Sequence, residues 1–199
     1  KTTLFNLLNG FVEAIQGNVL FEGNNLIGLK PNRICRLGVG RTFQVMRPFK
    51  DLTVIENVRV GALVATNSQA ESEAAARTAI ETVGLSDVSG TAAGLLTTVE
   101  LRLMEIARAL SSNPRLLLLD ETLAGLGGGE VDRVMQVLRS LASTGVTIVI
   151  IEHTMRAMVE LVDRFVVLDH GAVIAEGVPE VVMKDRKVIE AYLGKRWVA

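Results

Sequence analysis

The stretch LRLMEIARALSSNPRLLLLDE, residues 101–121, decides the fold, because it joins a helix-forming run to an apolar strand that ends on two acids. The consecutive leucines after Arg115 are typical of a strand buried on both faces of a parallel sheet. Such a strand delivers the carboxylate of Asp120 to the sheet edge where open α/β proteins bind ligands. Asp120 could then hold Mg²⁺, and Glu121 could orient or deprotonate a water molecule. Taken alone, the pair equally suits a strand that ends on two solvated acids.

The sequence on either side of this stretch alternates between strand and helix patterns. The elements expected before it are a helix from Thr2 ended by Gly10, a strand at 17–23, a helix at 31–39 and a β segment at 40–45. Those expected after it are a helix at 130–144, a second buried strand at 146–153, a hairpin at 164–177 with His-Gly in its turn, and helices at 178–183 and 187–194, the last ended by Gly194. Buried strands alternating with helices predict an α/β fold whose parallel sheet is covered on both faces.

Residues 48–108 interrupt this alternation with good helix formers throughout, such as the run ESEAAARTAIETVGL. No Pro/Gly/Ser-rich linker marks the segment as an independent domain. We therefore expect a helical lobe inserted into a single α/β domain.

The composition is that of a globular protein. Hydrophobic residues make up 49% of the 199 residues and the mean hydropathy is +0.35, which excludes a disordered chain. No apolar run approaches the roughly 18 residues that a membrane span requires. The net charge of −1 gives no broad electrostatic case for binding nucleic acid. The single cysteine, Cys35, excludes an intramolecular disulfide and fits a reducing compartment.

Other positions carry side chains suited to phosphate or metal binding. Lys1-Thr2-Thr3 precedes a helix and matches the end of the phosphate loop G-x-x-x-x-G-K-[ST], in which the lysine reaches the β and γ phosphates and the hydroxyl binds Mg²⁺. Gln44 ends the segment GRTFQ with an amide oxygen that can bind Mg²⁺. His153 follows the second strand, where it could contact a γ phosphate or an attacking water. Each is ambiguous alone, since Lys-Thr-Thr also suits a solvated helix start and a histidine after a strand is usually structural.

The order and spacing of these residues resemble the ATP-binding subunits of ABC transporters along the whole chain. In that resemblance Lys1 and Thr2 match the Walker A loop, Gln44 matches the Q-loop, and His153 matches the switch histidine. Asp120 and Glu121 match the Walker B aspartate and the catalytic glutamate. The segments LGVGRTFQVMRPFKDLTVIENVRVG (37–61) and VIEAYLG (188–194) are similar to the importer ATPases for branched-chain amino acids.

The resemblance implies a RecA-like P-loop NTPase core, formed by residues 1–47 and 109–199, with a helical subdomain at 48–108. It implies ATP and Mg²⁺ as cofactors. The implied nucleotide-binding residues are Lys1, Thr2, Thr3, Gln44 and Asp120, and the implied Mg²⁺ ligands are Thr2, Gln44 and Asp120. The implied catalytic residues are Glu121 and His153.

The implied partners are a second ATPase subunit, identical or different, membrane permease subunits and, indirectly, a substrate-binding protein. The implied location is peripheral, on the cytoplasmic face of the plasma membrane, and no nucleic-acid partner is expected. Because the Walker A glycines do not precede Lys1, we expect the sequence to be a fragment that begins inside that loop and leaves the core incomplete at the N-terminus. Backbone N–H groups of that loop supply much of the phosphate binding, so the isolated fragment should bind ATP weakly.

The sequence departs from the family pattern in the signature loop. Leu96-Thr97-Thr98-Val99-Glu100 stands where the family has LSGGQ or a variant that keeps the second glycine and the glutamine. We expect Val99 to add a branched side chain and Glu100 to add negative charge where a backbone should approach the γ phosphate of the partner's ATP. The aspartate-glutamate pair is followed by Thr122 instead of proline, and Gly127–Gly129 predict a flexible backbone in the next loop.

These departures leave more than one function open. The chain could be the energy-coupling ATPase of an importer that pairs one normal site with one degenerate site. It could instead be a nucleotide-binding regulatory subunit with little hydrolysis, or the ATPase of another ABC system such as lipid export or lipopolysaccharide transport. The degenerate loop could also reflect sequence drift or a sequencing error. The segments GRTFQ and TVIEN favour the importer.

Overall fold

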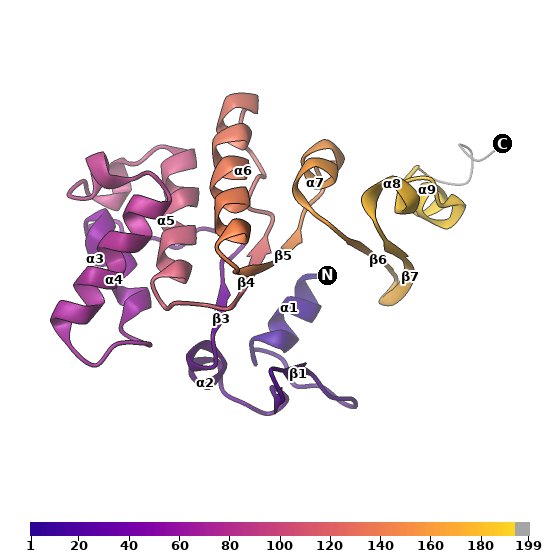
Figure 1. Ribbon diagram of the computed structural model, residues 1–199, viewed down its shortest axis with the longest axis horizontal. Coiled ribbons are helices and arrows are strands. Elements are labelled where there is room, and N and C mark those ends of the chain that lie inside the picture. The colour runs from indigo at the N-terminus through magenta and orange to yellow at the C-terminus, as the bar shows by residue number, and fades with distance from the viewer. Residues whose placement is uncertain (194–199) are drawn as a thin grey trace. The chain divides into compact units, whose positions relative to one another are not determined.

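The computed structural model describes residues 1–193, and the unit Thr2–Glu152 is built around a parallel sheet. Its strands are β3 (Val39–Arg41), β4 (Leu116–Asp120) and β5 (Thr147–Ile151), in the order β3-β4-β5 (Figure 1). Arg41 is in register with Leu118, and Asp120 is in register with Ile151. The carboxyl ends of these strands therefore lie at one edge, and the predicted α/β fold with a parallel sheet is confirmed.

Helices cover β4 on both faces. Leu118 packs in a cluster with Phe5 of α1 (Thr2–Leu8) and Ile34 of α2 (Pro31–Arg36). Leu117 and Leu119 are also fully buried, and alternation along a strand turns them to the opposite face. That face lies on the side of α6 (Gly128–Ser143), whose inner positions are buried (Figure 1). The leucine run thus forms the doubly covered strand that its composition predicts.

The prediction of a second fully buried strand at 146–153 was wrong. Thr147 is exposed and Val149 is 42% exposed, so the side chains of β5 alternate between solvent and protein. The reason is the strand order. Within Thr2–Glu152, β5 pairs with β4 on one side and lies at the edge of the described sheet.

The helical segment between β3 and β4 contains α3 (Val54–Ala62), α4 (Gln69–Thr82) and α5 (Thr98–Leu110), with 3₁₀ turns at Ser86–Val88 and Ala93–Leu95. These helices gather beside the sheet (Figure 1), and α3 packs on both α4 and α5. At the crossing of α3 and α5, a Cβ added to Gly61 would lie 2.0 Å from the carbonyl oxygen of Arg108. Only glycine allows this approach. The boundaries 48–108 for a separate subdomain stay a prediction.

The N-terminal elements differ in detail from the expected ones. In place of one strand at 17–23, β1 (Leu20–Phe21) and β2 (Asn24–Asn25) form a short antiparallel ribbon. Its turn residues, Glu22 and Gly23, both have positive φ, which suits a two-residue hairpin turn. The helix expected at 31–39 ends at Arg36, because Val39 already pairs in β3, and β3 itself ends at Arg41 rather than near 45.

The chain divides into Thr2–Glu152 and a second compact unit that holds Lys1 with His153–Ala199, of which residues 153–193 are described. The second unit contains α7 (Met155–Leu161), β6 (Phe165–Asp169), β7 (Ala172–Gly177), α8 (Pro179–Val182) and α9 (Arg186–Leu193). β6 and β7 form the predicted hairpin, and His170 and Gly171 in its turn have positive φ. Phe165, Val182 and Val188 form its core. The expected helix stop at Gly194 lies outside the described residues.

Within residues 1–193, none of the helices combines the length and apolar character that a membrane crossing would need.

Candidate functional site

Asp120 ends β4 at the carboxyl edge of the sheet and is only 1% exposed. Its Oδ2 lies 3.4 Å from Nη2 of Arg41, and its backbone N–H donates to Oγ1 of Thr42 at 3.4 Å. Its Oδ1 is buried and has no hydrogen-bond partner among the described residues. The carboxylate is thus held by β3 through one oxygen, and the other oxygen is available to a ligand.

Glu121 follows with a left-handed backbone, φ 52°, which is uncommon for a residue other than glycine. Its N–H donates to the carbonyl of Ile151, which ties the turn to β5. Its Oε2 accepts a hydrogen bond of 2.7 Å from Nε2 of Gln44. The structure therefore brings Gln44 and Glu121 together, 77 residues apart in the chain. Strained backbone of this kind is common at sites where a side chain must be aimed.

The turn after Glu121 is anchored by a residue that the sequence pattern did not single out. Glu152 is 5% exposed, and its Oε1 accepts a hydrogen bond of 2.6 Å from the N–H of Leu123. Thr122, at the position where the family has proline, is 2% exposed, and its hydroxyl has no partner among the described residues. The sequence does contain one sign that Glu152 could have such a role: it is an acid directly after an apolar strand, next to His153.

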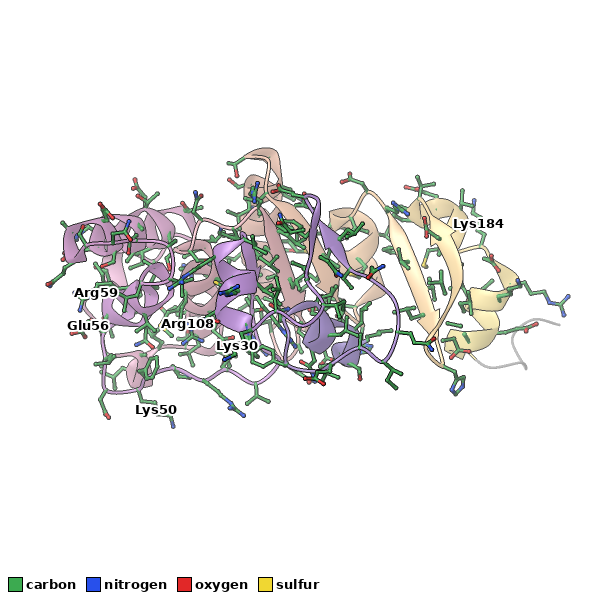
Figure 2. The ribbon with its side chains drawn as sticks, turned by 90° about the horizontal axis from the view of Figure 1, so that it is seen from below. Lys30, Lys50, Glu56, Arg59, Arg108 and Lys184 are labelled. Carbon is green, nitrogen blue, oxygen red and sulfur yellow. The ribbon has the colours of Figure 1, made fainter. Side chains whose placement is uncertain are left out.

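A buried charged cluster on α5 holds the segment that contains Gln44, and sequence reasoning also missed it. Nη1 of Arg102 donates to the carbonyl of Gln44 at 3.3 Å, and Oε1 of Glu105 accepts from the N–H of Arg47 at 3.3 Å. Arg108, labelled in Figure 2, donates to the carbonyl of Arg47 at 3.2 Å and to Oε1 of Glu105 at 3.2 Å. The sequence does contain one sign of this cluster: the charges are spaced three residues apart, which places them on one face of a helix.

The electrostatics of this cluster centre on Glu105, which is 3% exposed. Burial raises the pKa of its carboxyl, and Arg108, the N–H of Arg47 and Arg102 oppose that rise. The cluster joins α5 to the backbone of Gln44, whose side chain contacts Glu121. A chain of hydrogen bonds therefore runs from α5 through Gln44 to the carboxylate of Glu121.

The signature-loop segment closes the N-terminus of α5 with its own side chains. The N–H and Oγ1 of Thr97 donate to Oε2 of Glu100 at 2.8 and 2.7 Å, and the N–H of Glu100 donates to Oγ1 of Thr97. These hydrogen bonds from the Thr97 hydroxyl and backbone lower the pKa of Glu100. Val99 is 7% exposed, so its branched side chain packs in the core of the helical layer, and the effect of this residue on a partner's phosphate stays a prediction.

The triple glycine lies at the start of a helix. Gly128 and Gly129 form the first turn of α6, and Gly127 precedes it with φ −75°. The N–H of Gly127 donates to Oε2 of Glu130 at 2.8 Å. In place of an irregular loop, these glycines thus take part in the start of a helix.

The remaining predicted site residues lie at element boundaries. Thr2 and Thr3 form the start of α1, directly after Lys1. Lys1 and His153 belong to the second compact unit, so their roles beside Asp120 and Glu121 stay predictions.

The donor atoms at the sheet edge fit a magnesium ion that arrives with a phosphate substrate. In the described part of the chain, no group of three or more His, Cys, Asp or Glu side chains could hold a metal ion. Mg²⁺ typically uses one or two carboxylates, keeps several waters and binds substrate phosphates. The partnerless buried Oδ1 of Asp120 and the amide oxygen of Gln44 are hard oxygen donors of that kind.

Two family descriptions match the chain. The family described as ABC transporter matches residues 1–124, and the family described as branched-chain amino acid ATP-binding cassette transporter matches residues 172–197. The chain is 36% identical over 211 residues to a high-affinity branched-chain amino acid transport ATP-binding protein, BraF, of Pseudomonas aeruginosa. It is 38% identical over 213 residues to the corresponding LivG of Escherichia coli K12. Both matches cover 98% of this chain and 83% of the relative.

Solved structures agree with the sequence relatives. A nucleotide-free ATP-binding cassette from an ABC transporter matches with a TM-score of 0.87 and 31% identity, covering 98% of this chain and 83% of that one. The ADP conformation of an ATP-binding cassette of an ABC transporter matches with a TM-score of 0.87 and 32% identity, covering 98% and 84%. The fold is therefore that of an ATP-binding cassette, with the RecA-like core that the sequence resemblance implied.

Proposed function

The chain belongs to the ABC transporter family of transport-coupled ATPases, and from that premise we propose that it is the ATP-hydrolysing subunit of an importer for branched-chain amino acids. The substrate class is supported by the match at residues 172–197 and by the names of the curated relatives. The proposal that the subunit hydrolyses ATP rests on one observation. Gln44 forms a hydrogen bond of 2.7 Å with Glu121, directly beside the buried carboxylate of Asp120.

In this proposal each residue at the sheet edge has a distinct task. Asp120 and Gln44, with Thr2, hold the Mg²⁺ that accompanies ATP; when bound, the ion neutralises charge on the phosphates. Glu121 accepts a proton from the attacking water, and the hydrogen bond from Gln44 orients its carboxylate. Lys1 and Thr3, at the start of α1, bind the phosphates. His153 forms a hydrogen bond to the γ phosphate or to the attacking water.

The proposed partners follow from the same reading. The subunit pairs with a second ATPase subunit, and its helical segment 48–108 transmits the closure of this pair to membrane permeases. A substrate-binding protein is an indirect partner, through the permeases. It binds peripherally at the cytoplasmic face of the membrane through those permeases.

Glu121→Gln tests the catalytic assignment in the full-length protein assembled with its partners. Removing a general base typically lowers the rate about 10²–10⁴-fold, so steady-state ATP hydrolysis should fall by that order while ATP still binds. Glu130→Gln is the matched control, because Glu130 only closes the start of α6 and should leave the rate unchanged. Unchanged hydrolysis after Glu121→Gln would contradict the role of Glu121. The substrate class is tested separately: ATP-driven uptake of labelled leucine should follow hydrolysis, and hydrolysis without uptake would contradict it.

A second function, a regulatory subunit with little hydrolysis at its partner's site, is favoured by the closed N-terminus of α5. The carboxylate of Glu100 accepts hydrogen bonds from the N–H and the hydroxyl of Thr97 at this helix start, which in the family resemblance faces the partner's ATP. Glu100→Gln removes the charge and retains the shape, whereas a glycine at 99 would leave a cavity where Val99 is buried.

If this second function is correct, Glu100→Gln should raise ATP turnover at the partner's site. Thr53 and Glu56 form a capping box of the same design at α3, so Glu56→Gln is the matched control and should leave turnover unchanged (Figure 2 labels Glu56). Equal turnover in wild type and Glu100→Gln would count against a regulatory role.

A further inference from the structure

Arg41 places a buried positive charge at the end of β3, beside the carboxylate of Asp120. Its side chain is 5% exposed and that of Asp120 is fully buried, so this ion pair lies away from solvent. Burial lowers the pKa of the guanidinium, and Asp120 opposes that effect. Removing either member of a buried pair leaves the other without compensation, so each group requires the other.

Aromatic rings confine the guanidinium. Its central carbon lies 5.7 Å from the ring centroid of Phe5, 5.9 Å from that of Phe11 and 5.2 Å from that of Phe43. The Phe11 and Phe43 rings themselves pack edge to face at 6.0 Å. A planar cation is attracted to ring faces at these distances, so the group is held in position on several sides.

The two arms of the guanidinium join different elements. Nη1 donates to Oδ1 of Asn6 on α1 at 2.8 Å, and Nη2 donates to Oδ2 of Asp120 at 3.4 Å. Arg41 thus links the helix that begins with Thr2 and Thr3 to the last residue of β4. A lysine has a single point of charge and no planar fork, so it cannot reproduce both contacts in one geometry.

We propose that Arg41 is a positioning residue for Asp120, holding Oδ2 so that Oδ1 is presented to the Mg²⁺ that accompanies ATP. The inference rests on the proposed role of Asp120 as a Mg²⁺ ligand. It accounts for the unequal surroundings of the two carboxylate oxygens, one paired with Arg41 and the other buried without a partner among the described residues. Partners of a metal ligand orient it, and their loss typically lowers metal affinity or activity about 10–100-fold.

The test measures the Mg²⁺ dependence of nucleotide binding without hydrolysis. Full-length wild type and Arg41→Gln are heated with ATP alone and with ATP plus Mg²⁺, and the rise in melting temperature is followed as Mg²⁺ is titrated. Wild type should gain a further rise with Mg²⁺. Arg41→Gln should keep the rise with ATP alone and need about 10-fold more Mg²⁺ for the further rise. Hydrolysis measured in parallel should show a lower maximal rate with a nearly unchanged KM for ATP.

Arg115 provides a matched control at the opposite end of β4. It also lies against an aromatic ring, 5.6 Å from the centroid of Phe21, and pairs with the carboxylate of Glu22. Arg115→Gln should therefore leave the Mg²⁺ dependence unchanged. Should Arg41→Gln fail to fold, Asn6→Ala removes one anchor of Arg41 and keeps the ion pair, and it should shift the Mg²⁺ requirement in the same direction by less. Arg41→Lys should recover only part of the loss.

The outcomes separate this inference from the proposed function. If Asp120→Asn abolishes the Mg²⁺-dependent rise while Arg41→Gln and Asn6→Ala behave like Arg115→Gln, the positioning role is overturned and the role of Asp120 stands. If Asp120→Asn itself keeps the wild-type Mg²⁺ dependence, the proposed metal ligand is wrong, and the inference on Arg41 is overturned with it.

Discussion

The charged cluster on α5 leads to a prediction about Glu105, whose truncation should be among the most destabilising changes of an acidic residue in the chain. Glu105→Ala removes the carboxylate that accepts from the N–H of Arg47 and pairs with Arg108 at 3.2 Å and Arg102 at 3.9 Å. The Arg102 side chain is 8% exposed and would be left buried without its counter-charge. Glu73 offers the contrast, since its pair with Arg77 is an exposed i,i+4 contact.

The magnitude follows from burial. Removing one partner of a buried ion pair costs about 3–5 kcal/mol. Arg108 is 18% exposed at its side chain and can recover some solvation, so we expect the lower end, about 3 kcal/mol. In a protein of this size such a loss lowers the melting temperature by about 6–12 °C. The exposed pair of Glu73 contributes at most about 0.5 kcal/mol.

The assay is equilibrium urea unfolding of the full-length wild type, Glu105→Ala and Glu73→Ala, with the free energy of unfolding taken from each transition. A Glu105→Ala variant no less stable than Glu73→Ala would refute the reasoning that the cluster holds the Gln44 segment. Hydrogen exchange locates the effect: the amide of Arg47, which donates to Glu105, should lose protection in Glu105→Ala and keep it in Glu73→Ala.

The pH dependence tests the same cluster through the protonation of Glu105. Burial raises its pKa above the ordinary 4.5. Because the folded pKa exceeds the unfolded one, the linked stabilisation is fully present below pH 4.5 and is lost as the pH rises through the folded pKa. Glu105→Gln cannot ionise, so the stability of wild type relative to Glu105→Gln should fall as the pH rises from 4.5 toward neutrality. A difference that does not change with pH would show that burial does not govern this carboxyl.

Other predictions concern the packing of the helical layer, and each is measured by urea unfolding. Thr97→Ala and Thr53→Ala should each destabilise by about 1 kcal/mol, because both remove the hydroxyl of a capping box; unequal losses would contradict the equivalence of the two caps. Gly61→Ala should destabilise by about 1–3 kcal/mol, since its Cβ would lie 2.0 Å from a backbone oxygen of α5, and a neutral effect would rule out so close a crossing. Asn57→Ala should destabilise by about 1–3 kcal/mol, because its buried amide donates to several carbonyls of the turn before α3; Asn57→Asp, which replaces those donors by an acceptor oxygen and a buried charge, should be at least as unstable.

Features that depend on local pattern could be predicted from the sequence. A run of leucines closed by Asp120 predicts a doubly buried strand and an acid at the sheet edge, because burial and alternation are encoded in consecutive residues. The His-Gly turn predicts its hairpin for the same reason, since positive φ is required at both turn positions. The exposure of β5 could not be predicted, because an apolar run does not indicate whether the strand has neighbours on both sides.

Features that depend on contacts between distant segments were missed. Arg41 meets Asp120 across 79 residues, and Arg102 meets the backbone of Gln44 across 58. A charged residue inside an otherwise ordinary helix or strand pattern is normally a solvated one, so the sequence alone gives no reason to bury either arginine. Only the register of β3 against β4, and the crossing of α5 over the segment after β3, bring the charges together.

The segment Thr97–Glu100 shows how local and functional demands diverge at one helix start. Without the family's glycines, the sequence adopts the solution found at Thr53–Glu56: a threonine at the cap, a glutamate three residues on, and reciprocal hydrogen bonds between them. This arrangement satisfies helix donors that would otherwise require solvent or a ligand. It makes α5 more stable in isolation and its N-terminus less available to a phosphate. The same helix also holds the Gln44 segment through Arg102 and Glu105, and the Gln44 side chain contacts Glu121. The residues that close this helix start thus belong to the same helix that holds Gln44 against the carboxylate of Glu121.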